Sequence, residues 1–579
     1  MASFDIIIRN GLVFDGIGGN PFEADIGIKD GVIAAIGQVD AKAQEEIDAK
    51  GQIVTPGFVD VHTHYDGQAT WGQAMDPSSL HGVTTAIMGN CGVGFAPVHE
   101  ADHAQLIQLM EGVEDIPFPV LSEGLPWNWS SYPDYLDALA ARQFDIDLGS
   151  QLPHAAMRVH VMGERGVNRE PANADDVEKM GLLAETAARA GTFGFTTSRT
   201  LNHRSSTGDP TPTLKAGEEE LLGIAMGLSR AGKGVLQVVS DFTEGVDELE
   251  MLFRVARRSA RPLSISIAQN DANPSGWRML MSGIEQANKD GIEVRGQVGP
   301  RPVGVLLGLE LTLNPFSGHP SFEKISALPL DEKLAALRDL DFRARLLNET
   351  PTSNNPFVAA LLANFGKIFV LGDPPDYEPS ADKTVEAIAK ARGVSNEEVA
   401  LDMMLAHDGQ GVLYFPFLNY AQGTLEPTRE MLLNDYSIPG LSDGGAHVGM
   451  ICDGSFPTTL LTHWGRDRLR GDKIPLETLV KMQSHDTARW MGLNDRGVLQ
   501  LGYRADVNVI DFDNLRLHLP QINYDLPAGG RRLMQYASGY VASIVNGQVT
   551  YRDGTPTGAT PGRLVRGAQS APAQKLAAE

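Results

Sequence analysis

An alternation of short apolar strands with longer helical segments fills the middle of this 579-residue chain and constrains its fold more than any other feature. The pattern is typical of parallel strands joined by helical crossovers, and one α/β barrel can hold more than about 250 residues in a single domain. We therefore expect an α/β barrel. The predicted strands are 57–61, 83–88, 192–197, 235–239, 262–267 and 292–298, with helices between them, as at 175–190 and 217–231.

Both ends of the chain predict a small antiparallel sheet. Apolar runs at 4–8, 11–14, 25–28 and 32–36 are separated by turns, and similar runs return at 505–511 and 541–549, around Asn546-Gly547. Each set is too short to form a core of its own, so we expect them to pair into one β-sandwich. The predicted units are 1–56 and 491–567 for the sandwich, 57–490 for the barrel and 568–579 for a disordered tail.

Two segments interrupt the barrel pattern. Residues 102–146 contain prolines and tryptophans, which suggests a long loop or lid. Residues 299–385 combine proline-rich loops with an amphipathic helix near 330–347, which predicts an insertion. A later helix is expected to begin at Ser395, because Ser395 and Glu398 have the spacing of a capping box.

Composition excludes several classes of partner and compartment. The formal charge of -25 argues against nucleic acid or an anionic membrane, since both are bound by basic surfaces. Two cysteines exclude a disulfide framework. The sequence has no recognisable secretory signal and no uncharged apolar run of about 18 residues, so we expect a cytoplasmic enzyme that does not enter membranes.

The strongest chemical signal is His62-Thr63-His64, which follows the predicted strand 57–61. Residues two apart on a strand point to the same face, and the carboxyl ends of barrel strands are where active sites lie. Two imidazoles placed in this way can chelate one cation. The alternative is a pair of surface histidines.

Two further residues follow predicted strands and carry metal-binding groups. Cys91 comes after the next strand, where a thiolate would lie beside the histidines and suit zinc, although a free cysteine is often only a small buried apolar residue. Asp443 lies in 441–447, before two glycines. Its carboxylate could take a proton from water and pass it to a leaving nitrogen, or it could simply form an Asp-Gly turn.

Together these segments resemble the amidohydrolase superfamily, within its N-acyl-D-amino-acid deacylase branch. The resemblance covers nearly the whole chain and rests on 8–11, 56–64, 89–92, His154 with Arg158, 442–444, 545–547 and 557–563. It implies a zinc-bearing (β/α)8 barrel with a β-sandwich formed from both termini. It also implies hydrolysis of N-acylated D-amino acids to a D-amino acid and a carboxylate.

The same resemblance implies roles for individual residues. His62, His64 and Asp443 would form one metal position, and Cys91 would be a ligand of the tightly held zinc. Asp443 would be the general base and then the general acid. Apart from these carried-over roles, His447 is a candidate for substrate contact because it lies four residues after Asp443, and His154 matches a family position but could instead orient a loop. Arg199, Arg204 and Arg301 are candidates for gripping a substrate carboxylate through paired hydrogen bonds.

The sequence departs from the family pattern at two middle strands. The family normally has a histidine after each, but here the segments are Val238-Val239-Ser240-Asp241 and Ser266-Ile267-Ala268-Gln269. Gln269 stands where the family has a lysine that helps to hold the substrate carboxylate. Either one zinc is bound by the four residues above, or another group completes a second position. The best replacement is His203, which could instead be a substrate-contacting or structural residue; weaker oxygen ligands are Ser240, Asp241 and Gln269.

The sequence therefore predicts a zinc-dependent hydrolase, with one or two ions, that cleaves a linear amide such as an N-acyl amino acid. Its partner would be a small molecule, and a homo-oligomer is possible in principle. One alternative keeps the fold and changes the substrate to another amide, a carbamate or a cyclic amide. A second alternative is a barrel that has lost catalysis and serves as a binding or scaffold subunit, against which the retained His62, His64, Cys91 and Asp443 argue.

Overall fold

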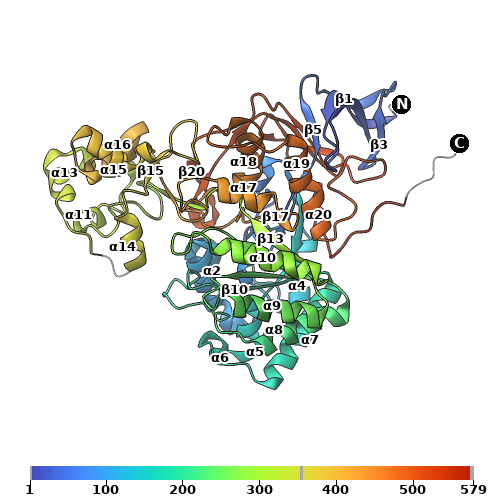
Figure 1. The fold of residues 1–579 in the computed structure, drawn as a ribbon, viewed down its shortest axis with the longest axis horizontal. Helices are drawn as coiled ribbons and strands as arrows, with labels where there is room; N and C mark the ends of the chain where they lie inside the picture. The colour runs from blue at the N-terminus through green and yellow to red at the C-terminus, as the bar shows by residue number, and fades with distance from the viewer. Residues whose placement is uncertain (1–2, 353–355, 574–579) are drawn as a thin grey trace.

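The computed structural model describes residues 3–352 and 356–573 (Figure 1). Its centre consists of parallel strands in two sheets. The first contains β6 (Phe58–Asp60), β7 (Val83–Met88) and β8 (Asp147–Ser150). The second contains β9 (Leu152–Pro153), β10 (Gly194–Arg199), β11 (Val235–Ser240), β12 (Leu263–Ile267), β13 (Val294–Val298) and β17 (Ser437–Pro439). The six strands predicted from apolar runs are confirmed.

The two parallel sheets adjoin each other at both edges. Only Gln151 separates β8 from β9, and Thr63 after β6 forms a parallel bridge with Gly444 after β17. The segments that follow the first and last parallel strands therefore lie side by side. The helices between consecutive strands are α7 (Ala174–Ala190), α8 (Glu218–Ala231), α9 (Val246–Ser259) and α10 (Gly276–Lys289), and they pack against one another on one side of the molecule (Figure 1).

The two ends of the chain form one nine-stranded sheet, so their predicted pairing is confirmed. The central contact is antiparallel, between β5 and β18, with Val54 opposite Val509. Asn546 and Gly547 have positive φ angles of 50° and 73° and make the predicted tight turn. The strands are β1 (Phe4–Val13), β2 (Phe22–Lys29), β3 (Val32–Gly37), β4 (Ala43–Asp48), β5 (Ile53–Pro56), β18 (Val507–Ile510), β23 (Tyr540–Val545), β24 (Gln548–Arg552) and β25 (Thr555–Pro556).

The runs predicted at 4–8 and 11–14 are a single strand, β1. Its pairing with β2 shifts register between Ile8 and Gly11, where Asn10 has a φ of 57°. A bulge of this kind bends a strand without ending it, which explains why the sequence suggested two strands.

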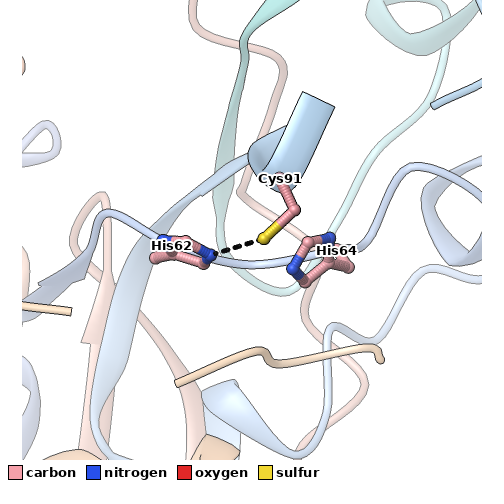
Figure 2. A group of neighbouring side chains, drawn as sticks. All are labelled: His62, His64 and Cys91. Carbon is pink, nitrogen blue, oxygen red and sulfur yellow. Dashed lines mark hydrogen bonds between the residues drawn. The ribbon is translucent and has the colours of Figure 1, made fainter. Parts of the chain in front are cut away.

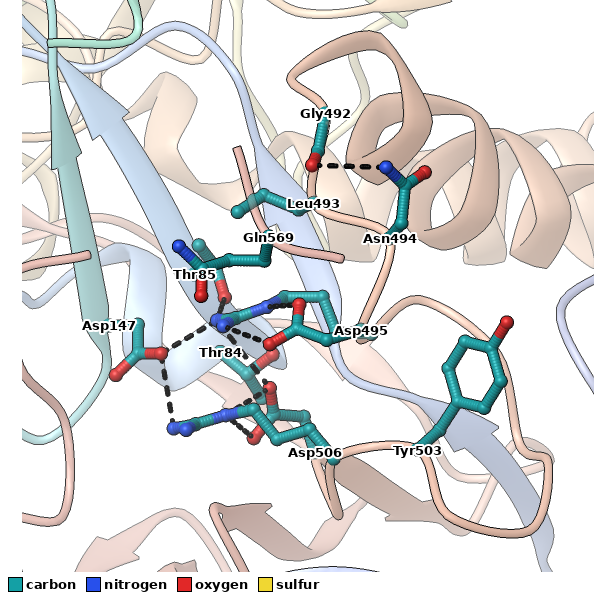
Figure 3. A network of polar contacts seen from close by, with 12 residues as sticks. Thr84, Thr85, Asp147, Gly492, Leu493, Asn494, Asp495, Tyr503, Asp506 and Gln569 are labelled. Atoms are coloured by element: carbon teal, nitrogen blue, oxygen red, sulfur yellow. Dashed lines mark hydrogen bonds and ion pairs between the residues drawn. The ribbon is translucent and has the colours of Figure 1, made fainter. Parts of the chain in front are cut away.

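A buried network of charged side chains ties the terminal sheet to the parallel strands (Figure 3). Asp147 of β8 forms ion pairs with Arg496 at 2.6 Å and with Arg504 at 3.1 Å, and Arg504 also contacts Asp506 at 2.9 Å. All four side chains are at most 8% exposed. Each charge therefore has an opposite partner, as buried charges require.

The first interrupting segment is helical, so the expectation of a long loop was wrong. It contains α2 (His103–Glu114), α3 (Phe118–Gly124) and α4 (Tyr132–Ala140). Its prolines lie where helices tolerate them: Pro117 precedes α3, and Pro133 is in the first turn of α4. Trp129 is buried and donates a hydrogen bond to the Phe95 carbonyl oxygen at 2.8 Å, which anchors the segment.

The second interrupting segment projects from the rest of the molecule and has a hydrophobic core of its own (Figure 1). It extends beyond residue 385 to β16. The helix predicted near 330–347 is two helices, because Asp339 adopts an extended conformation and caps the second by accepting a 2.8 Å hydrogen bond from the Phe342 N–H. Ser395 caps α16 as predicted, accepting from the Glu398 N–H at 3.1 Å.

The elements of this projecting segment are β14 (Gly304–Leu307), α11 (Pro320–Glu323), α12 (Leu330–Arg338), α13 (Leu340–Leu347), α14 (Pro356–Leu362), β15 (Phe369–Val370), α15 (Val385–Arg392), α16 (Asn396–Gly409) and β16 (Leu413–Pro416). The remaining short elements of the chain include α1 (Gln68–Trp71), α5 (His154–Met162), α6 (Glu164–Val167), α17 (Glu426–Leu432), α18 (Phe456–Thr459), α19 (Leu476–Lys481), α20 (Thr487–Trp490), β19 (Arg516–Leu517), β20 (Gln521–Leu526), β21 (Gly530–Met534) and β22 (Ala537–Ser538).

The predicted disordered tail is ordered at its start. The Gln569 N–H donates to the Gly492 carbonyl oxygen at 2.9 Å, and its carbonyl accepts from the Asn494 N–H at 3.0 Å. Residues 574–579 of the predicted tail lie outside the described residues. Across the described ranges, no helix combines the length and apolar character that crossing a bilayer requires.

Candidate metal centre

The chain segment after β6 places His62 and His64 at the carboxyl end of the first parallel strand. The Thr63 N–H donates to the Ile87 carbonyl oxygen of β7 at 3.0 Å, and the His64 N–H donates to the Gly444 carbonyl oxygen at 2.8 Å. The segment is thus held on both sides by backbone hydrogen bonds. Both imidazoles are at most 1% exposed, and their ring centroids are 5.6 Å apart.

Cys91 reaches the two histidines from the turn after β7 (Figure 2). Its Sγ lies 3.3 Å from His62 Nε2, and one donor atom from each of Cys91, His62 and His64 lies within 4.8 Å of the other two. The turn depends on Gly89, which has a φ of 85° and whose missing Cβ would lie 2.2 Å from the Gln151 carbonyl oxygen. No larger residue fits there, so the glycine allows the cysteine its position.

Asp443 approaches the same point from the segment after β17. Its Oδ1 lies 3.3 Å from His62 Nε2 and 3.4 Å from His64 Nε2. Asp443, Cys91 and His447 all have positive φ angles, of 48°, 53° and 49°. Such backbone conformations are unfavourable for residues other than glycine and cluster at functional sites.

The residues present fit a bound cation. His64 Nε2 and Asp443 Oδ1 are buried and have no hydrogen-bond partner, whereas nearly all buried polar atoms do. Each lies about 3.3 Å from another donor, close to the separation of two ligands that share a metal ion with bonds of about 2.0–2.3 Å. Two imidazoles, a thiol and a carboxylate form a donor set that suits zinc.

The electrostatics of these groups depend on their burial. Burial lowers the pKa of both His62 and His64, which favours the neutral ring whose lone pair a metal needs. Burial would raise the pKa of Asp443, but contact with the two histidines outweighs it and holds that pKa below its usual range. Burial and the nearby carboxylates of Glu114 and Asp443 raise the pKa of Cys91, and a bound cation would oppose this rise.

Two further residues contact the histidines and were not identified from the sequence. Gln297 of β13 places its Oε1 2.7 Å from His62 Nδ1. Glu114, the last residue of α2, is 1% exposed; its Oε1 is 3.3 Å from His64 Nδ1 and its Oε2 is 3.4 Å from His447 Nε2. The alternation of β13 could have shown Gln297 facing inward, but no local pattern indicates the place of Glu114.

His203 lies near the centre, in the loop after β10. Its Nδ1 is 2.9 Å from Ser198 Oγ. Burial, together with the neighbouring His447 and His64, lowers the pKa of His203 to about 3. Within the described chain, His62, His64 and Cys91 have donor atoms within 4.8 Å of one another, and His203 does not belong to this group. A direct metal contact by His203 stays a prediction.

Two of the predicted oxygen ligands bond to other groups. Ser240 donates to Glu248 Oε1 at 2.7 Å. The carboxylate of Asp241 accepts from Thr200 Oγ1 at 2.5 Å and from the Leu201 N–H at 2.7 Å. Asp241 therefore ties the end of β11 to the end of β10, and Ser240 ties β11 to α9.

His154 and Arg199 have partners within the protein. The His154 ring nitrogens lie 2.8 Å from Thr197 Oγ1 and 3.0 Å from Glu220 Oε1, and the ring is fully buried. Arg199 forms an ion pair with Glu248 at 2.6 Å. A substrate carboxylate would have to compete with that glutamate for the guanidinium.

Arg204 and Gln269 form hydrogen bonds with backbone groups of nearby loops. Arg204 is bonded to two backbone carbonyls of its own loop. Gln269 donates to the Pro274 carbonyl oxygen at 3.0 Å and accepts from the Ala421 N–H at 3.1 Å. Both contacts hold loops at the carboxyl end of β12.

A small pocket, with about 330 Å³ of empty space when the adjoining open solvent is included, lies beside Asp443. Its lining cation, Arg532, is paired with Asp525 at 2.8 Å and Asp76 at 3.0 Å. The predicted carboxylate-binding residue Arg301 is buried and paired with the lining residue Asp453 at 2.9 Å. The lining residues are Gln68, Pro77, 443–446, Val448, 451–454, Arg532 and Leu533.

Comparisons with known proteins find relatives that match nearly the whole chain. An uncharacterized protein of Mycobacterium tuberculosis is 28% identical, over 95% of this chain and 92% of its own length. D-aminoacylase of Alcaligenes xylosoxydans xylosoxydans is 26% identical, over 97% of each chain. A solved structure of D-aminoacylase, described with a binuclear metal centre, one-metal activation and second-metal attenuation, has a TM-score of 0.65, with 25% identity and coverage of 97% of this chain and 100% of that one.

The family comparison covers most of the chain. The profile of the Amidohydrolase family matches residues 45–551, a span that begins in β4 and ends in β24. This span includes the parallel strands and every residue of the candidate metal centre. The chain therefore belongs to the amidohydrolase family.

Proposed function

We propose that this chain is a zinc-dependent amidohydrolase that cleaves the linear amide bond of N-acyl-D-amino acids. The observation that carries the proposal is the convergence of His62, His64, Cys91 and Asp443 at one buried point beside a pocket. The full-length likeness to D-aminoacylase supports the choice of substrate class.

The four converging residues would hold one zinc ion. A second ion would need further ligands, and His203 is the candidate, because its ring lies near His64 and His447. The binuclear centre of the D-aminoacylase structure supports testing for two ions as well as one.

When bound, zinc would polarise the amide carbonyl and lower the pKa of the attacking water. Asp443 is placed to take a proton from that water, because it lies at the meeting point of the histidines and also lines the pocket. A pKa below its usual range keeps Asp443 ionised at neutral pH and able to accept the proton. It would then deliver the proton to the leaving nitrogen.

We also propose that the parallel strands close into a (β/α)8 barrel and that the terminal sheet folds into a β-sandwich. The bridge between Thr63 and Gly444 supports closure. A small-molecule amide as the partner, a cytoplasmic location and a homo-oligomer stay predictions.

The decisive experiment combines metal analysis with hydrolysis assays of Asp443→Asn. We expect one or two zinc ions per wild-type chain and a loss of activity of at least about 100-fold in the variant, since it removes a general acid–base. Asp453→Asn is the matched control, because Asp453 also lines the pocket but pairs with Arg301. Full activity of Asp443→Asn with zinc still bound would show the proposed mechanism to be wrong.

A different amide is the second candidate substrate. Gln269 replaces the family lysine and is bonded to backbone groups, and Arg199, Arg301 and Arg532 are all paired with carboxylates. The pocket therefore offers no unpaired guanidinium among these three for a substrate carboxylate. A panel of N-acyl-D-amino acids, hydantoins and aryl amides separates the two. Faster hydrolysis of a substrate without a carboxylate would favour the second candidate.

A further inference from the structure

Glu114 is a buried carboxylate beside the candidate metal centre that the chemistry above does not use. It comes from helix α2 of the inserted segment, not from a barrel strand. Its side chain is 1% exposed, and neither carboxylate oxygen has a hydrogen-bond partner within the described protein. An uncompensated buried carboxylate is strongly unfavourable. The ionised form of Glu114 therefore needs hydrogen-bond donors or a positive charge close by.

The two rings that face Glu114 are His64 and His447. Glu114 Oε1 lies 3.3 Å from His64 Nδ1, and Oε2 lies 3.4 Å from His447 Nε2. The other nitrogen of His64, Nε2, faces Asp443. Glu114 is therefore on the outer side of the His64 ring, away from the point where the donor atoms meet.

The two histidines of the centre share one arrangement. His62 Nε2 faces Cys91 and Asp443, while its Nδ1 faces Gln297 Oε1 at 2.7 Å. His64 likewise has an inward Nε2 and an oxygen at Nδ1, but that oxygen belongs to a carboxylate. Metal-binding histidines commonly donate their second ring N–H to a carboxylate or carbonyl, which fixes the tautomer and the ring orientation.

We propose that Glu114 is a positioning residue of the metal centre, which accepts the Nδ1–H of His64 through one oxygen and the Nε2–H of His447 through the other. This inference rests on the proposed metal centre. The backbone supports it, because the His447 N–H donates to the Glu114 carbonyl oxygen and so holds the Asp443 loop against the end of α2. In this arrangement, helix α2 fixes the orientation of the His64 ring. It also holds the loop that contributes Asp443 to the pocket lining.

Zinc affinity of the full-length protein, measured by competition with a chelator, tests this proposal. Glu114→Met keeps a similar length without an acceptor, and we expect it to weaken zinc binding about 10- to 100-fold. Glu114→Gln should weaken it less, because its amide oxygen can still accept from His64 as Gln297 does from His62. Asp115→Asn is the matched control with unchanged affinity, because Asp115 bonds to Thr312 and the Gly449 N–H.

The melting temperature of the metal-free protein separates positioning from packing. Metal-free Glu114→Met should melt close to the wild-type temperature, since an apolar side chain of similar length replaces a carboxyl group whose burial is itself unfavourable. Unchanged zinc affinity in both Glu114 variants overturns the proposal. So does equally weakened binding in Asp115→Asn. If the Met variant does not fold, Glu114→Gln decides: weaker zinc binding supports the proposal, and wild-type affinity overturns it. A wild-type protein that binds no zinc would instead refute the proposed function.

Discussion

At the scale of single residues, the candidate metal centre depends on donors with no other bonding partner. His64 Nε2 and Asp443 Oδ1 are buried without hydrogen bonds, whereas His154 and Arg199 have their polar atoms occupied by neighbouring side chains. Unoccupied buried donors and acceptors cost free energy, and a bound cation removes that cost. This contrast separates residues that fit a metal from residues that hold the fold together.

The two cysteines offer a direct test of the metal site. Cys91→Ser should lower zinc affinity at least about 10-fold, because a serine hydroxyl is a much poorer zinc ligand than a thiolate. In the cobalt-substituted protein, the thiolate-to-metal charge-transfer absorption should also disappear. Cys452→Ser is the matched control, since Cys452 is buried but contacts Arg301 and Tyr377 rather than the histidines. Equal zinc affinity in Cys91→Ser and the wild type would exclude Cys91 as a ligand.

At the scale of elements, the inserted segments form contacts that their sequences do not reveal. Glu378, in the loop after β15, accepts from Arg468 Nε at 3.1 Å, lies 3.1 Å from His463 Nε2 and accepts from the Leu425 N–H at 2.9 Å. His463 lies in a helix at 460–467, Arg468 directly follows that helix, and Leu425 directly precedes α17. One carboxylate thus joins three separate elements.

The pH dependence of stability follows from this carboxylate. Burial would raise the pKa of Glu378, but the bonds from His463 and Arg468 outweigh it and lower the pKa from 4.5 to about 2. Because the folded pKa is below the unfolded value, the stabilisation is present above pH 4.5 and is lost as the pH falls toward 2. Glu378→Gln should cost about 3 kcal/mol at pH 7, because it leaves the buried Arg468 without its main counter-charge.

The measurement is the free energy of unfolding in urea at pH 7 and pH 3. The difference between wild type and Glu378→Gln should shrink at the lower pH. Glu426→Gln is the control, because this second partner of Arg468 is 41% exposed and should cost less than about 1 kcal/mol. A difference that stays constant from pH 7 to pH 3 would mean that the charge of Glu378 does not contribute.

At the scale of the whole molecule, the candidate metal centre lies at the carboxyl ends of the parallel strands, and the projecting segment has a separate core. The donors come from the ends of β6 and β7 and from the segment after β17, which a parallel bridge holds together. The projecting segment from β14 to β16 packs around its own apolar residues, away from these strands (Figure 1). Zinc should therefore stabilise the first region and not the second.

Hydrogen exchange in the presence and absence of a chelator tests this expectation. With zinc at about 100 times its dissociation constant, binding stabilises the folded state by about 2.7 kcal/mol. Amides of β6, β7 and 441–447 that exchange through local opening should therefore exchange about 100-fold faster after zinc removal, whereas those of α12, α13 and α16 should not change. Uniform acceleration across both regions would contradict the separation.

The sequence by itself determined the parts of this protein that local patterns encode. Periodicity fixes where β6, β7 and β10–β13 lie, and the turn at Asn546-Gly547 follows from residues that accept positive φ. Strand alternation also puts His62 and His64 on one face. Prolines, in contrast, misled the assignment of 102–146, because proline is compatible with the first turn of a helix as well as with loops.

Only the tertiary structure decided which distant groups meet. Asp443 reaches the histidines because the segments after β6 and β17 meet at the bridge between Thr63 and Gly444, and Glu114 reaches His64 from the end of α2. Both contacts join residues far apart in the chain, and no local pattern specifies them. The same holds for His154 and Arg199, whose partners Glu220 and Glu248 became visible only once α8 and α9 were placed beside the strands.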